Sequence, residues 1–181
     1  MKSHLFPALK LTILTILFFC IVYPALVWGI AQLSPTKGNV AWVEHKGKVV
    51  GAALIGQSFT QDTYFQGRPS AAGYNAASSA GSNKGPSNPD YLKDVQARID
   101  TFLIHNPGVK KADIPADLVT ASGSGLDPDI SVTGALVQIP RIARLRQISE
   151  EKLQQLVKTH TQRSLIGGVE TVNVLQLNAA L

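Results

Sequence analysis

The sequence predicts a mixed α/β (α+β) domain anchored by one N-terminal transmembrane helix. Residues 11–33 form a long apolar stretch, and the roughly 150 residues that follow are enough for one compact domain. In that second part, short strand-like runs alternate with amphipathic helical patterns, and Gly- and Ser-rich segments separate them. We therefore expect a cytoplasmic tail over 1–10, a membrane helix over 11–33 and an extracytoplasmic domain over 34–181.

The apolar stretch contains no Asp, Glu, Lys or Arg. About 20 predominantly apolar residues suffice to cross a bilayer core. Proline and glycine are more frequent in membrane helices than in soluble ones, and aromatic residues favour the water–lipid boundary. The residues that we assign to the membrane helix include Leu11, Phe18, Tyr23, Pro24 and Trp28.

A cleaved signal peptide is the alternative for this stretch. Lys2 and Lys10 provide a basic start, and residues 29–31 resemble a cleavage site, but the apolar run exceeds the usual 7–15 residues. The same two lysines favour a cytoplasmic N-terminus and a domain outside the plasma (inner) membrane. Lysines after the span, such as Lys37, weaken this bias.

Charge and cysteine content exclude several classes of protein. The net charge is +5, without a run of five or six like charges, so nucleic-acid binding is not predicted. The single cysteine, Cys20, lies in the span, and no intramolecular disulfide is possible. The four histidines are scattered, so no metal site is predicted.

The elements after the span are predicted from caps, turns and periodicity. Strands over 40–44 and 48–55 are joined at Gly47. A helix capped by Asn88 follows, with Leu92, Val95, Ile99, Phe102 and Leu103 on its core face. After it come a strand over 117–121, a helix capped by Asp129 or Ser131 and kinked or divided at Pro140, a helix starting at Ser149, and a closing strand over 171–177.

Residues 51–58 mimic a phosphate-binding loop. Gln57 replaces its lysine and the interior resembles a strand, so no nucleotide site is predicted.

Residues 60–89 form a long segment without periodicity. Such a loop in a small domain is usually functional or disordered. Two interpretations stay open: docking on a partner, which we favour for Arg68, and pinning to the domain's own core, which we favour for Phe65. The interface candidates here are Tyr64, Phe65, Gly67, Arg68, Pro69, Ser70, Tyr74 and Asn75.

A second candidate segment lies between the predicted strand and the helix that follows it. Its interface candidates are Ser122, Gly123, Ser124, Gly125 and Asp127. The glycine turn resembles an anion cradle, but Asp127 and Asp129 would repel phosphate. A serine nucleophile here would need a base that the sequence does not indicate, and two carboxylates alone do not predict a cation site.

The segments YPALVWGIAQ, GKVVGAALIGQSF, YFQGRPSAAGYN, GSNKGPSNP, DLVTASGSGLDPDIS, IPRIARLR and VNVLQLN follow one another along nearly the whole chain. In this order they resemble the C subunit family of the bacterial Kdp-type potassium-transporting P-type ATPases. The chain departs from that pattern at Asp129, where histidine is common, at Val132-Thr133, where Pro-Glu is common, and at Lys84, where an apolar residue is usual.

The resemblance implies a non-catalytic accessory subunit of a high-affinity, ATP-driven potassium uptake complex. Its partners would be the potassium-conducting subunit, the ATP-hydrolysing subunit and the lipid bilayer. The family is described as aiding assembly and as a catalytic chaperone that raises ATP affinity; no cofactor is expected to bind this chain directly. ATP is cytoplasmic and the domain is expected outside, so any effect on ATP would be allosteric. The alternative is a membrane-anchored extracytoplasmic hydrolase that uses Ser122 or Ser124.

Overall fold

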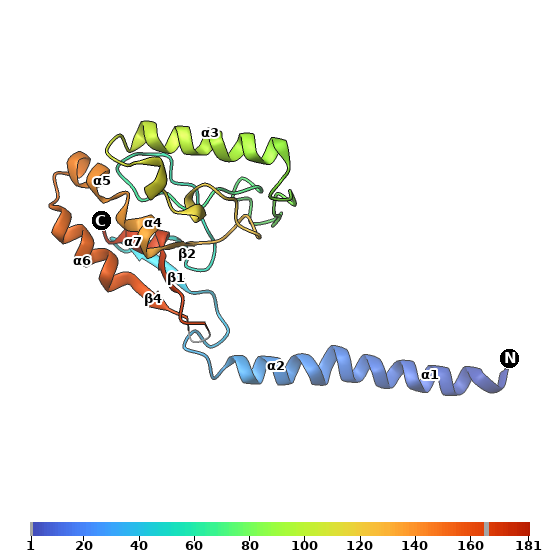
Figure 1. The fold of residues 1–181 in the computed structure, drawn as a ribbon. Coiled ribbons are helices and arrows are strands. Elements are labelled where there is room, and N and C mark those ends of the chain that lie inside the picture. The colour runs from blue at the N-terminus through green and yellow to red at the C-terminus, as the bar shows by residue number, and fades with distance from the viewer. Residues whose placement is uncertain (1, 165–166) are drawn as a thin grey trace. The chain divides into compact units, whose positions relative to one another are not determined.

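The computed structural model describes residues 2–164 and 167–181. The chain divides into two units, Met1–Ala41 and Trp42–Leu181. Helices and short strands are mixed in the second unit, as the sequence predicts (Figure 1).

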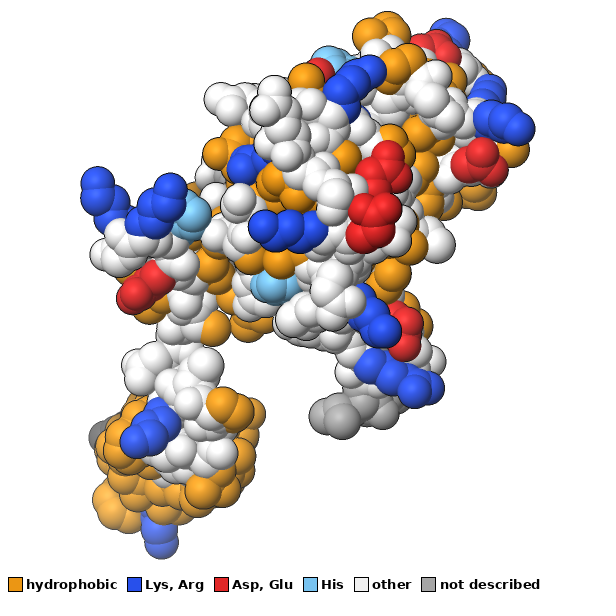
Figure 2. All heavy atoms as spheres, turned by 90° about the vertical axis from the view of Figure 1, so that its left-hand side faces the viewer, with side chains coloured by type: hydrophobic (Ala, Val, Ile, Leu, Met, Phe, Trp, Pro, Cys, Tyr) orange, Lys and Arg blue, Asp and Glu red, His pale blue; other side chains and the backbone are white. Residues whose placement is uncertain are grey.

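Most of the N-terminal unit is one continuous helix built of α1 (Lys2–Leu17), a π-helical turn (Phe18–Val22) and α2 (Tyr23–Ala31), and turns follow it. Its portion His4–Ala31 is 28 residues long with a mean hydropathy of 2.4, which by length and composition is enough to cross a membrane. Hydrophobic side chains cover most of the surface of this helix that is visible in Figure 2. The helix thus begins before residue 11 and ends before residue 33.

The π-helical turn precedes Pro24, which has no N–H to donate to the carbonyl of Cys20. The N–H of Tyr23 instead reaches back five residues to the carbonyl of Phe18. Such local widening is one way in which a membrane helix accommodates a proline. The hydroxyl of Thr12 donates to the carbonyl of Ala8, 2.9 Å away, so this polar group is satisfied within the helix.

The C-terminal unit starts with the predicted hairpin. Strands β1 (Trp42–His45) and β2 (Lys48–Ala52) are antiparallel, with an irregular register between Val43 and Glu44. Lys46 and Gly47 both have positive φ, 51° and 76°, as a two-residue type I′ turn requires. The second strand ends three residues earlier than predicted. Residues 53–88, which include most of the predicted loop, contain no helix or strand.

A three-stranded antiparallel sheet has the order β3-β5-β4. Its strands are β3 (Asp129–Ser131), β4 (Thr161–Arg163) and β5 (Glu170–Asn173). The predicted closing strand over 171–177 is wrong beyond Asn173, because the chain turns there into helix α7 (Val174–Ala179). The Asn173 side chain accepts a hydrogen bond from the N–H of Gln176 and so caps that helix.

The predicted strand over 117–121 is also wrong. Residues Ala116–Leu118 form a short 3-10 helix, η3, which follows another such turn, η2 (Lys111–Asp113). The Asp117 carboxylate accepts hydrogen bonds from the N–H and the hydroxyl of Ser131, at 2.7 and 3.1 Å. The segment is therefore tied to the start of the next helix through its side chain rather than paired as a strand.

The predicted helix starts are confirmed. Asn88 caps α3 (Pro89–His105), Ser131 caps α4 (Val132–Leu136), and Ser149 caps α6 (Glu150–His160), each through a side-chain oxygen that accepts from the first turn. Pro140 lies at the start of a separate helix, α5 (Ile139–Arg146), so the predicted division occurs. In Figure 1, α3 runs along one side of the unit. Of its predicted core face, Phe102 is buried but Leu92 is 53% exposed.

One hydrophobic core lies within this unit. Its largest fully buried apolar side chains are Phe65, Ile130, Ile139, Ile142, Leu153, Val157, Val172 and Leu177. They come from the long loop, the sheet and helices α5, α6 and α7. The loop that contains Phe65 is therefore part of the fold.

Candidate functional site

Two buried amide side chains hold the long loop against the helices. Asn178 of α7 accepts from the N–H of Phe65 at 2.8 Å and donates to its carbonyl at 2.9 Å. Gln138, immediately before α5, does the same for Gln66, at 2.8 and 3.1 Å. Each amide thus satisfies both main-chain groups of one loop residue, as a neighbouring strand would. The ring of Phe65 is 0% exposed, which agrees with the pinning interpretation for this residue.

Arg141 of α5 lies beneath the same loop with a buried side chain. Its Nη2 donates to the carbonyl of Tyr64 at 2.9 Å and to Gln138 Oε1 at 2.8 Å. Burial lowers the pKa of Arg141, and the Asp62 carboxylate, 3.7 Å from Nη1, opposes that shift. Arg146 places its guanidinium 4.7 Å from the centre of the Tyr64 ring. Tyr64 is thus held from both its backbone and its ring.

The two predicted interface segments lie against each other. The N–H of Ser122 donates to the carbonyl of Pro69 at 3.1 Å, and the hydroxyl of Ser70 donates to the carbonyl of Gly125 at 2.6 Å. Gly125 has a φ of +69°, and a Cβ there would lie 2.8 Å from the Cβ of Ala72. This close approach requires glycine.

Arg68 and Asp127 join the two segments through an ion pair. Their Nη1 and Oδ2 atoms are 2.9 Å apart, and the two side chains are 26% and 28% exposed. The hydroxyl of Tyr74 donates to the carbonyl of Arg68. The pKa of Tyr74 is raised by burial and further by the charge of Asp127, while Arg68 opposes the shift. A Cβ on Gly67 would lie 3.1 Å from that hydroxyl, so glycine makes room for the tyrosine.

The remaining candidates lie nearer the surface. Asn75 and Gly123 are exposed, and the Asn75 side chain accepts from the N–H of Ala77 at 3.1 Å. The carbonyl of Ser124 accepts from the N–H of Ala80 at 2.9 Å. The interface role of these residues stays a prediction.

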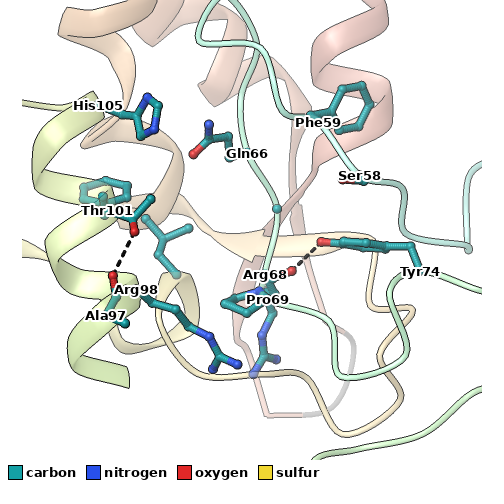
Figure 3. A pocket seen from close by; sticks show the side chains of 13 residues that line it. Ser58, Phe59, Gln66, Arg68, Pro69, Tyr74, Ala97, Arg98, Thr101 and His105 are labelled. Atoms are coloured by element: carbon teal, nitrogen blue, oxygen red, sulfur yellow. Dashed lines mark hydrogen bonds between the residues drawn. The ribbon is translucent and has the colours of Figure 1, made fainter. Parts of the chain in front are cut away.

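A pocket of about 370 Å³ lies between the long loop and α3 (Figure 3). The loop and the residues just before it contribute Ser58, Phe59, Gln66, Gly67, Arg68, Pro69 and Tyr74. The chain after the loop contributes Ala97, Arg98, Thr101, Phe102, His105 and Leu118. Sequence reasoning did not select Arg98 or His105. Their spacing from Phe102 along α3 places them beside its buried face, which is the signal that could have found them.

The hydroxyls of Ser122 and Ser124 are occupied by the turn itself. They accept from the N–H groups of Gly125 and Leu126, at 2.9 and 3.0 Å. Among residues 2–164 and 167–181, neither hydroxyl bonds a histidine or a carboxylate, and no group of three or more His, Cys, Asp or Glu could hold a metal ion. A hydrolase would need a nucleophile–base pair that these serines do not form.

The segment that resembles a phosphate loop is also engaged within the fold. Gly51 and Ala52 belong to β2, and the Gln57 amide donates to the carbonyl of Val50 at 3.2 Å. The N–H of Gly56 donates to the carbonyl of Leu126 at 2.7 Å. The N–H of Gly56 and the side-chain amide of Gln57 are therefore bonded within the fold, whereas the strand that the sequence predicts over 48–55 ends at Ala52.

Within the part of the chain that the structure describes, one apolar N-terminal helix long enough to cross a membrane is followed by a mixed helix–sheet unit, which suggests a membrane-anchored protein. The family model for KdpC, the c chain of the K⁺-transporting ATPase, matches residues 5–181, and the chain belongs to this family. It is therefore an accessory subunit of the potassium uptake system.

Related proteins match the sequence of this chain over nearly its full length. The chain is 55% identical to the potassium-transporting ATPase KdpC subunit of Flavobacterium psychrophilum over 179 residues, which cover 99% of this chain and 97% of the relative. It is 50% identical to that of Bacteroides thetaiotaomicron, over 98% and 96% of the two chains. The identity is 47% to that of Gemmatimonas aurantiaca, over 100% and 93%. The family resemblance proposed from the sequence is confirmed.

Proposed function

We propose that this chain is a non-catalytic, single-pass subunit that docks on the potassium-conducting subunit of its complex. The observation that carries this proposal is the Arg68–Asp127 pair. It fastens the two interface segments together while leaving both side chains about a quarter exposed. Arginine and aromatic residues in a rigid surrounding are the residue types that dominate interfaces.

The proposed arrangement places the N-terminus in the cytoplasm and residues 34–181 outside the inner membrane. Lys2 and Lys10, at the N-terminal end of the apolar helix, support this orientation. A cysteine introduced at Ser82, in a Cys20→Ser background, should react with an impermeant reagent added to intact cells. A cysteine at Ser3 should react only after lysis, and the reverse pattern would overturn the orientation.

Potassium conduction and ATP hydrolysis then belong to partner subunits. A chaperone effect on ATP affinity would act indirectly, because a domain outside the membrane cannot touch a cytoplasmic nucleotide. The route would be the apolar helix or a neighbouring subunit. Such coupling requires two states whose balance this chain changes.

Docking is tested by replacing either member of the ion pair. Arg68→Ala should weaken co-purification of the complex by about 1–3 kcal/mol, the usual range for a charged hydrogen bond. Asp127→Asn is the matched control, because it breaks the same internal pair but retains the arginine. A solvent-accessible ion pair contributes at most about 1 kcal/mol to folding, so both variants should melt close to the parent.

Two results would contradict the docking proposal. One is normal assembly of the Arg68→Ala protein. The other is an equal loss of assembly for both variants together with a lower melting temperature, which would assign the pair a purely structural role.

A further inference from the structure

One end of the pocket beside α3 has an excess of positive charge. In Figure 3 the guanidinium groups of Arg68 and Arg98 point towards the same end of the pocket, one from the loop and the other from the helix. None of the residues that line the pocket is an aspartate or a glutamate. Asp127 pairs with Arg68 from behind, and Asp94, which the charge of Arg98 also reaches, is itself paired with Lys84 at 2.8 Å.

Both arginines retain unused donors. The Nη1 of Arg68 donates a hydrogen bond to Asp127, and the Nη1 of Arg98 donates one to the carbonyl of Val119 at 3.1 Å. Within residues 2–164 and 167–181, the Nη2 of either arginine makes no further hydrogen bond. Two guanidinium groups and one carboxylate leave one net positive charge at this end of the pocket.

We propose that this end of the pocket receives a single carboxylate on an aliphatic stem, supplied by an aspartate or glutamate side chain of the neighbouring subunit. The inference rests on the docking function proposed above. One net charge matches a monoanion, and guanidinium–carboxylate contacts are among the strong hydrogen bonds of proteins. Asp127 would repel a phosphate dianion. Apolar walls from Pro69, Ala97 and Phe102 suit the methylene groups of the stem.

The chemistry of the pocket is tested on the full chain in detergent, without any partner. Butyrate should produce a saturable NMR shift of the Arg98 guanidinium signals, with a Kd on the order of millimolar. Neutral butyramide and inorganic phosphate should bind more weakly. Arg98→Gln should reduce butyrate affinity about tenfold, as expected for one charged hydrogen bond. Arg144→Gln is the matched control, because Arg144 is exposed on α5 and does not line this pocket.

The absence of a saturable butyrate shift, or equal binding of butyramide, would overturn the carboxylate site. Tighter binding of phosphate than of butyrate would overturn the match to a monoanion. Neither result depends on whether the subunits dock.

The source of the carboxylate is tested in the assembled complex. Arg98→Gln should weaken co-purification about tenfold while Arg144→Gln leaves it unchanged. If butyrate binds the isolated chain but Arg98→Gln assembles normally, the partner's side chain is excluded as the occupant. If Arg68→Ala also assembles normally, the docking function itself fails while the carboxylate site stands.

Discussion

At the scale of single residues, the long loop depends on buried polar side chains. Gln138 and Asn178 are 0% and 6% exposed, and each binds both main-chain groups of a loop residue. In the sequence, Gln138 stands between the apolar residues Val137 and Ile139, and Asn178 directly follows the predicted strand over 171–177. The sequence does not show which main-chain groups these amides bind, because the loop has no periodicity that fixes its position. Only Phe65 could be assigned to the core from its chemistry.

Asn178→Ala should destabilise the loop more than a surface substitution. It leaves the N–H and carbonyl of Phe65 buried without partners, at a cost of about 1–3 kcal/mol for each such group. Hydrogen exchange of the Phe65 amide should therefore accelerate in the detergent-solubilised chain. Gln154→Ala, an exposed change on α6, should leave that amide unaffected. Unchanged exchange at Phe65 in the Asn178→Ala protein would refute the role of this amide.

Asp129 should lower stability at neutral pH. Its pKa is raised from 3.8 by burial and then by the charge of Asp127, against a hydrogen bond from Asn173 that lowers it. The folded state therefore binds this proton more tightly than the unfolded state. Stability is greatest below the unfolded pKa and falls as the pH rises through the folded pKa.

Asp129→Asn should accordingly raise the melting temperature near about pH 7 and change it little below about pH 4, where the carboxyl is already protonated. Thermal melts of both proteins across this range measure the difference. A lower melting temperature of the variant at neutral pH, with no gain anywhere, would show that the carboxylate is favourable in the fold.

At the scale of elements, helix starts could be predicted and short strands could not. Asn88, Ser131 and Ser149 are capping residues whose side chains act locally, so the sequence alone locates them. Strands β3 and β4 contain three residues each, too few to show an alternating pattern. The run over 171–177 alternates like a strand, but the cap at Asn173 starts a helix within it.

Gly56, just after the hairpin, packs closely against the backbone of the second interface segment at Asp127. A Cβ at this position would lie 2.5 Å from the carbonyl oxygen of Asp127, and a backbone atom cannot move aside as a flexible side chain can. Gly56→Ala should destabilise the protein by about 1–3 kcal/mol through overpacking. Gly108→Ala is the control, because a Cβ there meets nothing within 4 Å. Equal melting temperatures for the two variants would contradict this packing.

At the scale of the whole molecule, the apolar helix and the family were both readable from the sequence. Absence of charge over more than 20 residues is a local signal, and the family motifs run through the chain in order. The pocket beside α3 was not predictable. Arg98 and Arg68 are 30 positions apart in sequence, and only the packing of the loop on the helix brings them together.

The full chain should bind ATP no more tightly than about millimolar, equivalent to roughly −4 kcal/mol. The N–H of Gly56 and the side-chain amide of Gln57 are engaged within the fold, and residues 51–58 contain no phosphate-binding lysine. Calorimetry on the detergent-solubilised chain measures this affinity, with Gln57→Ala as the diagnostic variant. A micromolar affinity that Gln57→Ala abolishes would contradict an indirect effect on ATP.

The proposed function requires the exposed residues of the long loop, among them Asn75, to contact the potassium-conducting subunit. Asn75 lies in the same loop as Arg68 and is exposed. A photoreactive residue in place of Asn75 tests this contact directly in the intact complex. The same residue in place of Gln154, exposed on α6, is the control. After illumination, mass spectrometry should find adducts to the potassium-conducting subunit from position 75 and not from position 154. Adducts from position 75 to the ATP-hydrolysing subunit alone, or to no subunit, would contradict the account.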